Sequence, residues 1–146
     1  MQNGFTLIEL LVTLLLMTLL ALWSFSSLKE YRDLQIARSN ALEISSLIKE
    51  ARQKTLSAET DTQFGVHVAT SSITVFEGAS YNPSDPNNLT FTFLRTNLLT
   101  QLSDSSSDIM FARLTGVPSA TGTIAVGDTA LNSTTTITIQ EAGLVE

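Results

Sequence analysis

The chain opens with a run of 21 residues that is apolar on every side. From Phe5 to Phe25 the only formal charge is Glu9. As a helix this run would reach about 31 Å, close to the ~30 Å hydrocarbon thickness of a bilayer. A buried core helix is the weaker interpretation, because the remainder of a chain this size is too small to surround such a stretch. The run therefore predicts a helix that crosses a membrane once, with Trp23 as an interfacial anchor.

A cleaved secretory signal peptide fits this run less well than a retained anchor. No Lys or Arg precedes the run, it exceeds the usual ~7–15 residue apolar region, and no A-x-A cleavage site follows it. The flanking charges at positions 29–33 cancel, so the positive-inside rule does not orient the segment. We expect the segment to stay attached to the chain.

A second helical pattern follows from Leu28 to about Ala58, where the chain contains neither Pro nor Gly. Apolar residues recur there at spacings of three and four. They are Leu34, Ala37, Ala41, Ile44, Ile48 and Ala51. The two segments can form one continuous helix of about 54 residues, roughly 80 Å long. Only the serines at positions 24, 26 and 27 offer a plausible bend.

After Glu59 the pattern changes to the short alternation of strands separated by turn residues. The predicted strands are 64–68, 72–76, 90–93, 108–111, 123–126 and 135–139, and the densest cluster of turn residues is 82–88. An antiparallel sheet must cover its apolar face, and the stripe of the stem helix is available to do so. The predicted fold class is α+β, a long N-terminal helix packed on a C-terminal antiparallel β-sheet domain.

Composition narrows the function classes. The chain has 146 residues, 43% hydrophobic and 15% charged, with a net charge of −6, which disfavours nucleic-acid binding. It has no Cys, so thiolate chemistry and disulfides are excluded. The part from residue 61 to residue 146 holds eight acids and two bases, which suggests a surface exposed to solvent outside the bilayer.

The most specific feature is the opening Gly4-Phe5-Thr6-Leu7-Ile8-Glu9-Leu10-Leu11-Val12. Here the sequence resembles the type IV pilin and pseudopilin family, whose precursors carry a short polar leader ending in Gly, an aromatic first mature residue and a Glu four positions further on. The resemblance implies that a membrane prepilin peptidase cleaves between Gly4 and Phe5 and methylates the new amine of Phe5.

Glu9 is unusual because it places a carboxylate inside the predicted membrane span. A carboxylate at the centre of a bilayer costs about 2.5–3.5 kcal/mol on insertion scales, so it needs a partner or a role. Phe5 lies one helical turn before Glu9, which permits local neutralisation by the new amine. The resemblance implies instead that Glu9 meets the Phe5 amine of a neighbouring subunit and sets the axial register of helices in a filament.

Several departures from the family pattern favour a minor subunit. The leader lacks Lys and Arg, Ser26 stands where major pilins commonly have a kinking Pro, and the paired C-terminal cysteines are missing. The distal part looks like the H-type minor pseudopilin of type II secretion and its FimT-like pilin relatives, on the strands 64–68 and 72–76 and the ending 137–145.

Other candidate chemistry is weak. His67, the only histidine, alternates with valines in a predicted strand and is expected on a polar face or as a half-buried, hydrogen-bonded residue. Asp85, Asp104 and Asp108 could offer oxygen ligands to Ca²⁺, but no EF-hand spacing supports that, and solvated turn residues are the simpler interpretation. We predict no catalytic residue, no metal site and no cofactor.

The predicted function is a minor pseudopilin, a structural subunit rather than an enzyme, held in the inner membrane with its C-terminal domain on the periplasmic or extracellular side. Its expected partners are the prepilin peptidase, other pilin subunits, the assembly platform and lipid. The alternatives are a FimT-like minor pilin for adhesion, motility or DNA uptake, a non-polymerising anchored binding domain, and a membrane-tethered hydrolase. The expected segments are a leader (1–4), a transmembrane helix (5–25), a stem helix (26–59) and a β-rich domain (60–146).

Overall fold

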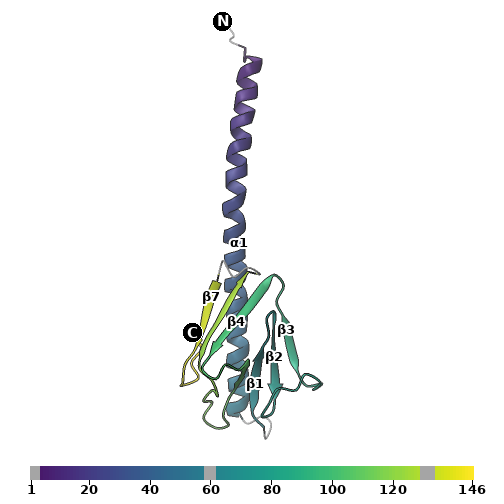
Figure 1. Cartoon of the computed structure of the whole chain (residues 1–146), viewed down its shortest axis with the longest axis vertical. Coiled ribbons are helices and arrows are strands. Elements are labelled where there is room, and N and C mark those ends of the chain that lie inside the picture. The colour runs from purple at the N-terminus through teal and green to yellow at the C-terminus, as the bar shows by residue number, and fades with distance from the viewer. Residues whose placement is uncertain (1–3, 58–61, 129–133) are drawn as a thin grey trace.

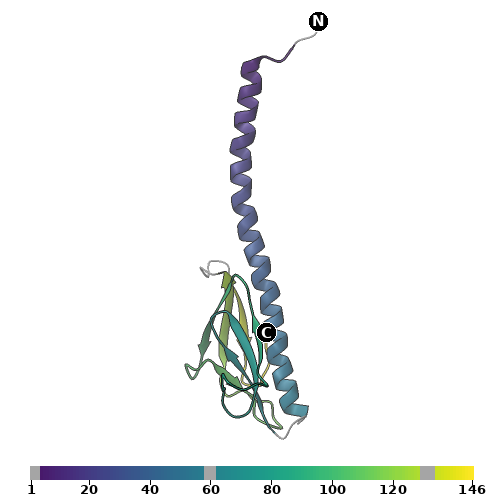
Figure 2. The same cartoon turned by 90° about the vertical axis from the view of Figure 1, so that its right-hand side faces the viewer.

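A single long helix carries the whole architecture. The computed structural model describes residues 4–57, 62–128 and 134–146, and for residues 23–30 it describes the backbone only. Helix α1 (Leu7–Ser57) runs without a break for 51 residues, and its N-terminal half projects away from the β-strands (Figures 1 and 2). The predicted continuous helix is confirmed. The serines proposed as a bend lie where side chains are outside the described residues, and the helix continues through them.

The C-terminal half of α1 buries the stripe that the sequence indicates. Ala37, Ala41, Ile44, Ile48 and Ala51 are all buried. They recur every three or four residues, so they lie on one side of the helix. Leu34, the first residue of the predicted stripe, is only half-buried.

In the part of the chain that the structure describes, seven strands form two antiparallel sheets rather than the single sheet expected from the pattern. Their bounds are β1 (Phe64–Val68), β2 (Ser72–Glu77), β3 (Leu89–Thr92), β4 (Thr96–Leu102), β5 (Asp108–Met110), β6 (Gly122–Asp128) and β7 (Thr134–Ile139). One sheet has the order β3-β2-β1-β5 and the other β4-β6-β7. The α+β class with an antiparallel β-domain is confirmed.

Strand β4 is the element that the sequence pattern misses. Its residues Thr96, Leu98 and Leu102 are buried, while Leu99 is about half exposed. Two adjacent leucines and a third three residues later do not alternate, and Asn is a poor strand former. The strand exists because it pairs along its whole length with β6 and because Leu98 N–H donates to Thr70 O at 2.7 Å. Its cause is tertiary pairing rather than local preference.

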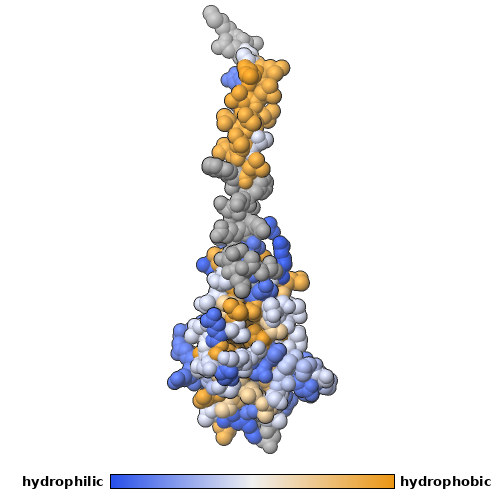
Figure 3. Space-filling model, viewed as in Figure 1, coloured by the Kyte–Doolittle hydropathy of each residue, from blue (hydrophilic) through white to orange (hydrophobic). Residues whose placement is uncertain are grey.

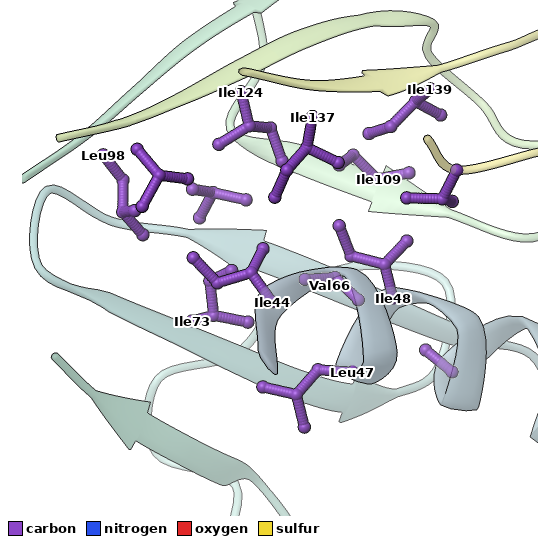
Figure 4. Packing of buried hydrophobic residues seen from close by; sticks show 14 of the residues in the cluster. Ile44, Leu47, Ile48, Val66, Ile73, Leu98, Ile109, Ile124, Ile137 and Ile139 are labelled. Carbon is purple, nitrogen blue, oxygen red and sulfur yellow. The ribbon is translucent and has the colours of Figure 1, made fainter. Parts of the chain in front are cut away.

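The core lies where α1 meets both sheets. Ile44 and Ile48 of the helix pack with Val66 of one sheet and with Ile124 and Ile137 of the other (Figure 4). One face of α1 packs against both sheets, so the helix shields apolar residues of each sheet from solvent. The helix stripe is therefore the component on which the β-domain depends.

Polar contacts fix the lower end of the helix to the strands. The buried Thr55 hydroxyl donates to Ala51 O at 3.0 Å and accepts from Phe64 N–H at 3.0 Å, so it ties the helix end to the start of β1. Arg52 donates from Nε to Gly116 O and from Nη2 to Ala142 O, both at 3.0 Å. These bonds hold two loops far apart in the sequence against the same helical turn.

We expect Ile48→Ala to lower the free energy of unfolding of the β-domain by about 2–5 kcal/mol, because it opens a cavity where helix and both sheets meet. Urea denaturation of the full chain in detergent measures this. The matched control is Leu42→Ala on the same helix, where 75% of the side chain is exposed. That change should stay within about 0.5 kcal/mol. Equal effects of the two substitutions would contradict the packing described.

Candidate functional site

The chain enters α1 through an exposed, non-helical segment. Gly4, Phe5 and Thr6 precede the first helical residue, and Phe5 is 84% exposed. A side chain added at Gly4 would find no heavy atom within 4 Å, and Gly4 is not in the left-handed region. The fold therefore does not require a glycine here. The Gly4–Phe5 peptide bond is open to an external enzyme that binds an extended chain.

Thr6 caps the helix and places Glu9 in its first turn. Thr6 Oγ1 accepts from Glu9 N–H at 3.3 Å, and Thr6 O accepts from Leu10 N–H at 3.2 Å. The spacing of Thr6 and Glu9 is that of a capping box, in which the acid also favours the positive end of the helix dipole. Glu9 thus has a local structural role besides any role between subunits, and its side chain remains exposed.

The surface of α1 from Leu7 to Leu22 is apolar all round. Every residue there is exposed, and Glu9 carries its only charge. The hydroxyls of Thr13 and Thr18 donate back to Leu10 O at 3.0 Å and Leu15 O at 2.8 Å, so their polarity is satisfied within the helix. Figure 3 shows this segment as a continuous hydrophobic surface above a mixed, largely polar β-domain. Such a surface is far larger than monomeric soluble proteins leave uncovered.

Among the described residues, no helix meets the length and hydropathy expected of a membrane span. The predicted span continues to Phe25, so its last three residues, including the proposed anchor Trp23, lie outside the described side chains.

His67 is half-buried and hydrogen-bonded, as predicted. Its Nδ1 lies 2.6 Å from Asp108 Oδ1, and its ring stacks on Tyr81 with centroids 4.0 Å apart and planes 8° apart. Asp108 neighbours His67 because β1 and β5 pair in that register. Tyr81 belongs to the loop after β2, and no periodicity in the sequence points to it. The group links β1, β5 and that loop.

The other two acids considered as cation ligands are engaged in turns. Asp85 Oδ1 accepts from Asn87 N–H at 2.9 Å, and Asp104 Oδ1 accepts from the N–H and hydroxyl of Ser106 at 3.0 and 2.8 Å. The Ser106 N–H, followed by its hydroxyl, holds the pKa of Asp104 below its usual range. Because the folded pKa is lowered, these bonds contribute above the unfolded pKa and are lost as the pH falls through the folded one. Within the described parts of the chain, no three acidic or histidine side chains gather as metal ligands.

Comparison with known proteins gives one finding, at the N-terminus. Residues 1–25 match the prokaryotic N-terminal methylation motif. No curated protein and no solved structure matches the chain. The matched residues contain Gly4, Phe5 and Glu9 together with most of the apolar helix surface.

The chain carries the N-terminal motif of the type IV pilin and pseudopilin family, and the resemblance drawn from the sequence is confirmed at that level. The motif supports a substrate of prepilin peptidase and points to a structural subunit rather than an enzyme. The match ends before the β-domain, so it does not distinguish an H-type minor pseudopilin from other members.

We expect Thr6→Val to destabilise the first turn of α1 by about 1 kcal/mol, because the Glu9 N–H loses its acceptor. Amide hydrogen exchange of Glu9 in detergent micelles should become about fivefold faster. Thr6→Ser keeps the hydroxyl and should exchange at the native rate. If Thr6→Val left the exchange of Glu9 unchanged, Thr6 would not be the cap.

Proposed function

We propose that this chain is a minor pseudopilin of a type II secretion system, cleaved between Gly4 and Phe5 and built into a filament through α1. The observation that carries the proposal is the surface of α1 between Leu7 and Leu22. It is apolar on every side, carries one carboxylate, and follows directly on an exposed Gly4–Phe5 bond.

The leader and the helix have separate roles in this proposal. Residues 1–4 are removed, and Phe5 becomes the N-methylated first residue. Residues 5–25 hold the chain in the inner membrane as a single span before assembly and lie among other helices after it. Residues 26–59 connect this span to the β-rich domain of residues 60–146.

Glu9 is the polar group that gives the assembly its register. When lipid or neighbouring helices cover α1, a bare carboxylate is costly, and an amine is the natural partner for it. Cleavage creates that amine on Phe5. We place it beside Glu9 of a neighbouring subunit, because the Glu9 side chain is exposed in the isolated chain and can accept a partner from outside it. Van der Waals packing between the apolar helices supplies the remaining contacts.

The β-domain is the part exposed to the periplasm or the outside. Figure 3 shows it as a mixed surface with many hydrophilic residues, and its net charge is negative. Its partners in this proposal are other pilin or pseudopilin subunits, and the chain also meets prepilin peptidase, the membrane assembly platform and lipid. A FimT-like minor pilin of a type IV pilus shares all of these features and is the principal alternative.

Processing is tested by expressing the chain with an active prepilin peptidase and measuring the mass of its N-terminal peptide. We expect a chain that begins at Phe5 and is one methyl group heavier than the unmodified sequence. Gly4→Val should leave the chain uncleaved, while the melting temperature of the β-domain stays unchanged, since no atom lies near Gly4. Asn3→Ala is the matched control and should be cleaved normally. An intact Met1 in the presence of active peptidase contradicts the proposal.

A further inference from the structure

Strand β7 has an open edge on the side away from β6. Thr138 exchanges backbone hydrogen bonds with Glu146, from N–H to O at 2.7 Å and from Glu146 N–H to Thr138 O at 3.0 Å. Backbone groups alternate in direction along a strand, so Thr136, two residues earlier, points the same way. Among the described residues, the N–H and C=O of Thr136 have no hydrogen-bond partner. Its N–H and C=O are available to another strand.

An apolar groove runs beside this edge, between β7 and α1. Its volume is about 280 Å³, with Ala41, Leu42 and Ser45 on the helix side and Thr135, Thr136 and Ile137 on the strand side. Leu42 is 75% exposed, although it faces this groove. A strand placed here would meet backbone groups on one side and an apolar helix wall on the other.

The chain already adds a short strand to β7 further along the same edge. Leu144 O accepts from Gln140 N–H at 2.9 Å, and Val145 forms a bridge with Ile139 in the antiparallel sense. The geometry of the edge therefore accepts an antiparallel addition. The groove continues along this edge of β7 toward Thr136 and Thr134.

The sequence of β7 does nothing to block this edge. Edge strands are usually protected by Lys, Pro, a bulge or short length. β7 reads Thr134-Thr135-Thr136-Ile137-Thr138-Ile139, and all six residues pair in unbroken register with β6. By contrast β3, at the edge of the other sheet, has only four residues.

The charges of the groove give the added strand a direction. Asn40 of α1 bonds to Thr96, and Thr96 pairs with Asp128, which lies a few residues before the start of β7. Arg52, further along α1, bonds to Ala142, which lies just after the end of β7. The helix and β7 therefore run in the same direction. Arg38 lies at the Thr134 end of the groove and Glu146 at the Thr138 end. An antiparallel strand would then carry its cation first and its anion last.

We propose that this groove binds an extended segment of another protein chain, which adds to β7 as an antiparallel strand. The segment places apolar residues at alternate positions over Ala41, Leu42 and Ile137, a basic residue beside Glu146 and an acidic residue beside Arg38. Main-chain bonds to Thr136 supply affinity, and the groove and its two charges supply selectivity. The proposal does not depend on cleavage at Gly4.

The test uses the full chain in lipid nanodiscs and a fluorescent hexapeptide, acetyl-Lys-Val-Thr-Val-Thr-Glu-amide. Fluorescence anisotropy should show saturable binding. A second peptide has the same side chains but is N-methylated at the alternate backbone nitrogens that would face β7. It cannot donate hydrogen bonds to the strand edge, so it should bind at least about tenfold more weakly. The charge-reversed peptide, with Glu first and Lys last, should also bind more weakly.

Variants of the chain separate the edge from the groove. Thr136→Pro removes the outward N–H, and Leu42→Lys puts a charge in the groove, so each should weaken binding at least about tenfold. Thr136→Val keeps the N–H and should bind normally. If Thr136→Pro fails to fold, Leu42→Lys still tests the groove, because the Leu42 side chain is exposed and its replacement should not disturb the fold. No binding of the peptide, or equal binding by the N-methylated peptide, overturns the proposal. Gly4→Val should bind as the native chain does, whatever the fate of the processing proposal.

Discussion

The structure depends on the packing of one face of α1 against two sheets. Six buried hydrophobic residues from Ala37 to Ala51 form the face of α1 that packs against the strands, and the bonds of Thr55 and Arg52 hold the lower end of the helix in register with the strands. The same helix is uncovered from Leu7 to Leu22, where its apolar residues face every direction. The helix is unbroken between these two parts, so it connects the uncovered segment directly to the β-domain.

This division separates stability from assembly. Substitutions in the lower stripe act on folding of the β-domain. The described residues of the upper segment are exposed in the isolated chain, and in the proposed function they act when lipid or other helices cover them. Glu9 is the exception, because an acid in the first turn suits the positive end of the helix dipole and Glu9 also carries the one charge of the uncovered surface. The edge of β7 is a third kind of surface. It lies beside a small groove between β7 and α1, and its Thr136 backbone groups have no hydrogen-bond partner among the described residues.

Much of the fold could be predicted from the sequence, because its signals are local. The helical spacing of Ala41, Ile44 and Ile48 follows from which face must be buried, and short apolar runs bounded by turn residues, several of them alternating, locate six of the seven strands. β4 was missed because its leucines do not alternate and its strand character comes from pairing with β6. The division into two sheets was missed for the same reason, since register between distant strands leaves no periodic trace. The prediction for His67 is confirmed, yet its stacking on Tyr81 depends on the path of a loop. Cleavage and methylation at Gly4 and Phe5 remain predictions, because they depend on another protein.

The central claim is that the charge of Glu9 pairs with the amine of Phe5 in the assembled filament. Glu9→Gln tests it most directly, because the substitution keeps size and hydrogen-bonding capacity and removes only the charge. Co-expression with the partner subunits, followed by quantification of the chain in sheared filaments, should show normal cleavage at Gly4 but a loss of incorporation of about tenfold or more. Thr13→Val, on the same uncovered surface, should incorporate as the native chain does. Native-level incorporation of the Glu9→Gln chain would contradict the account.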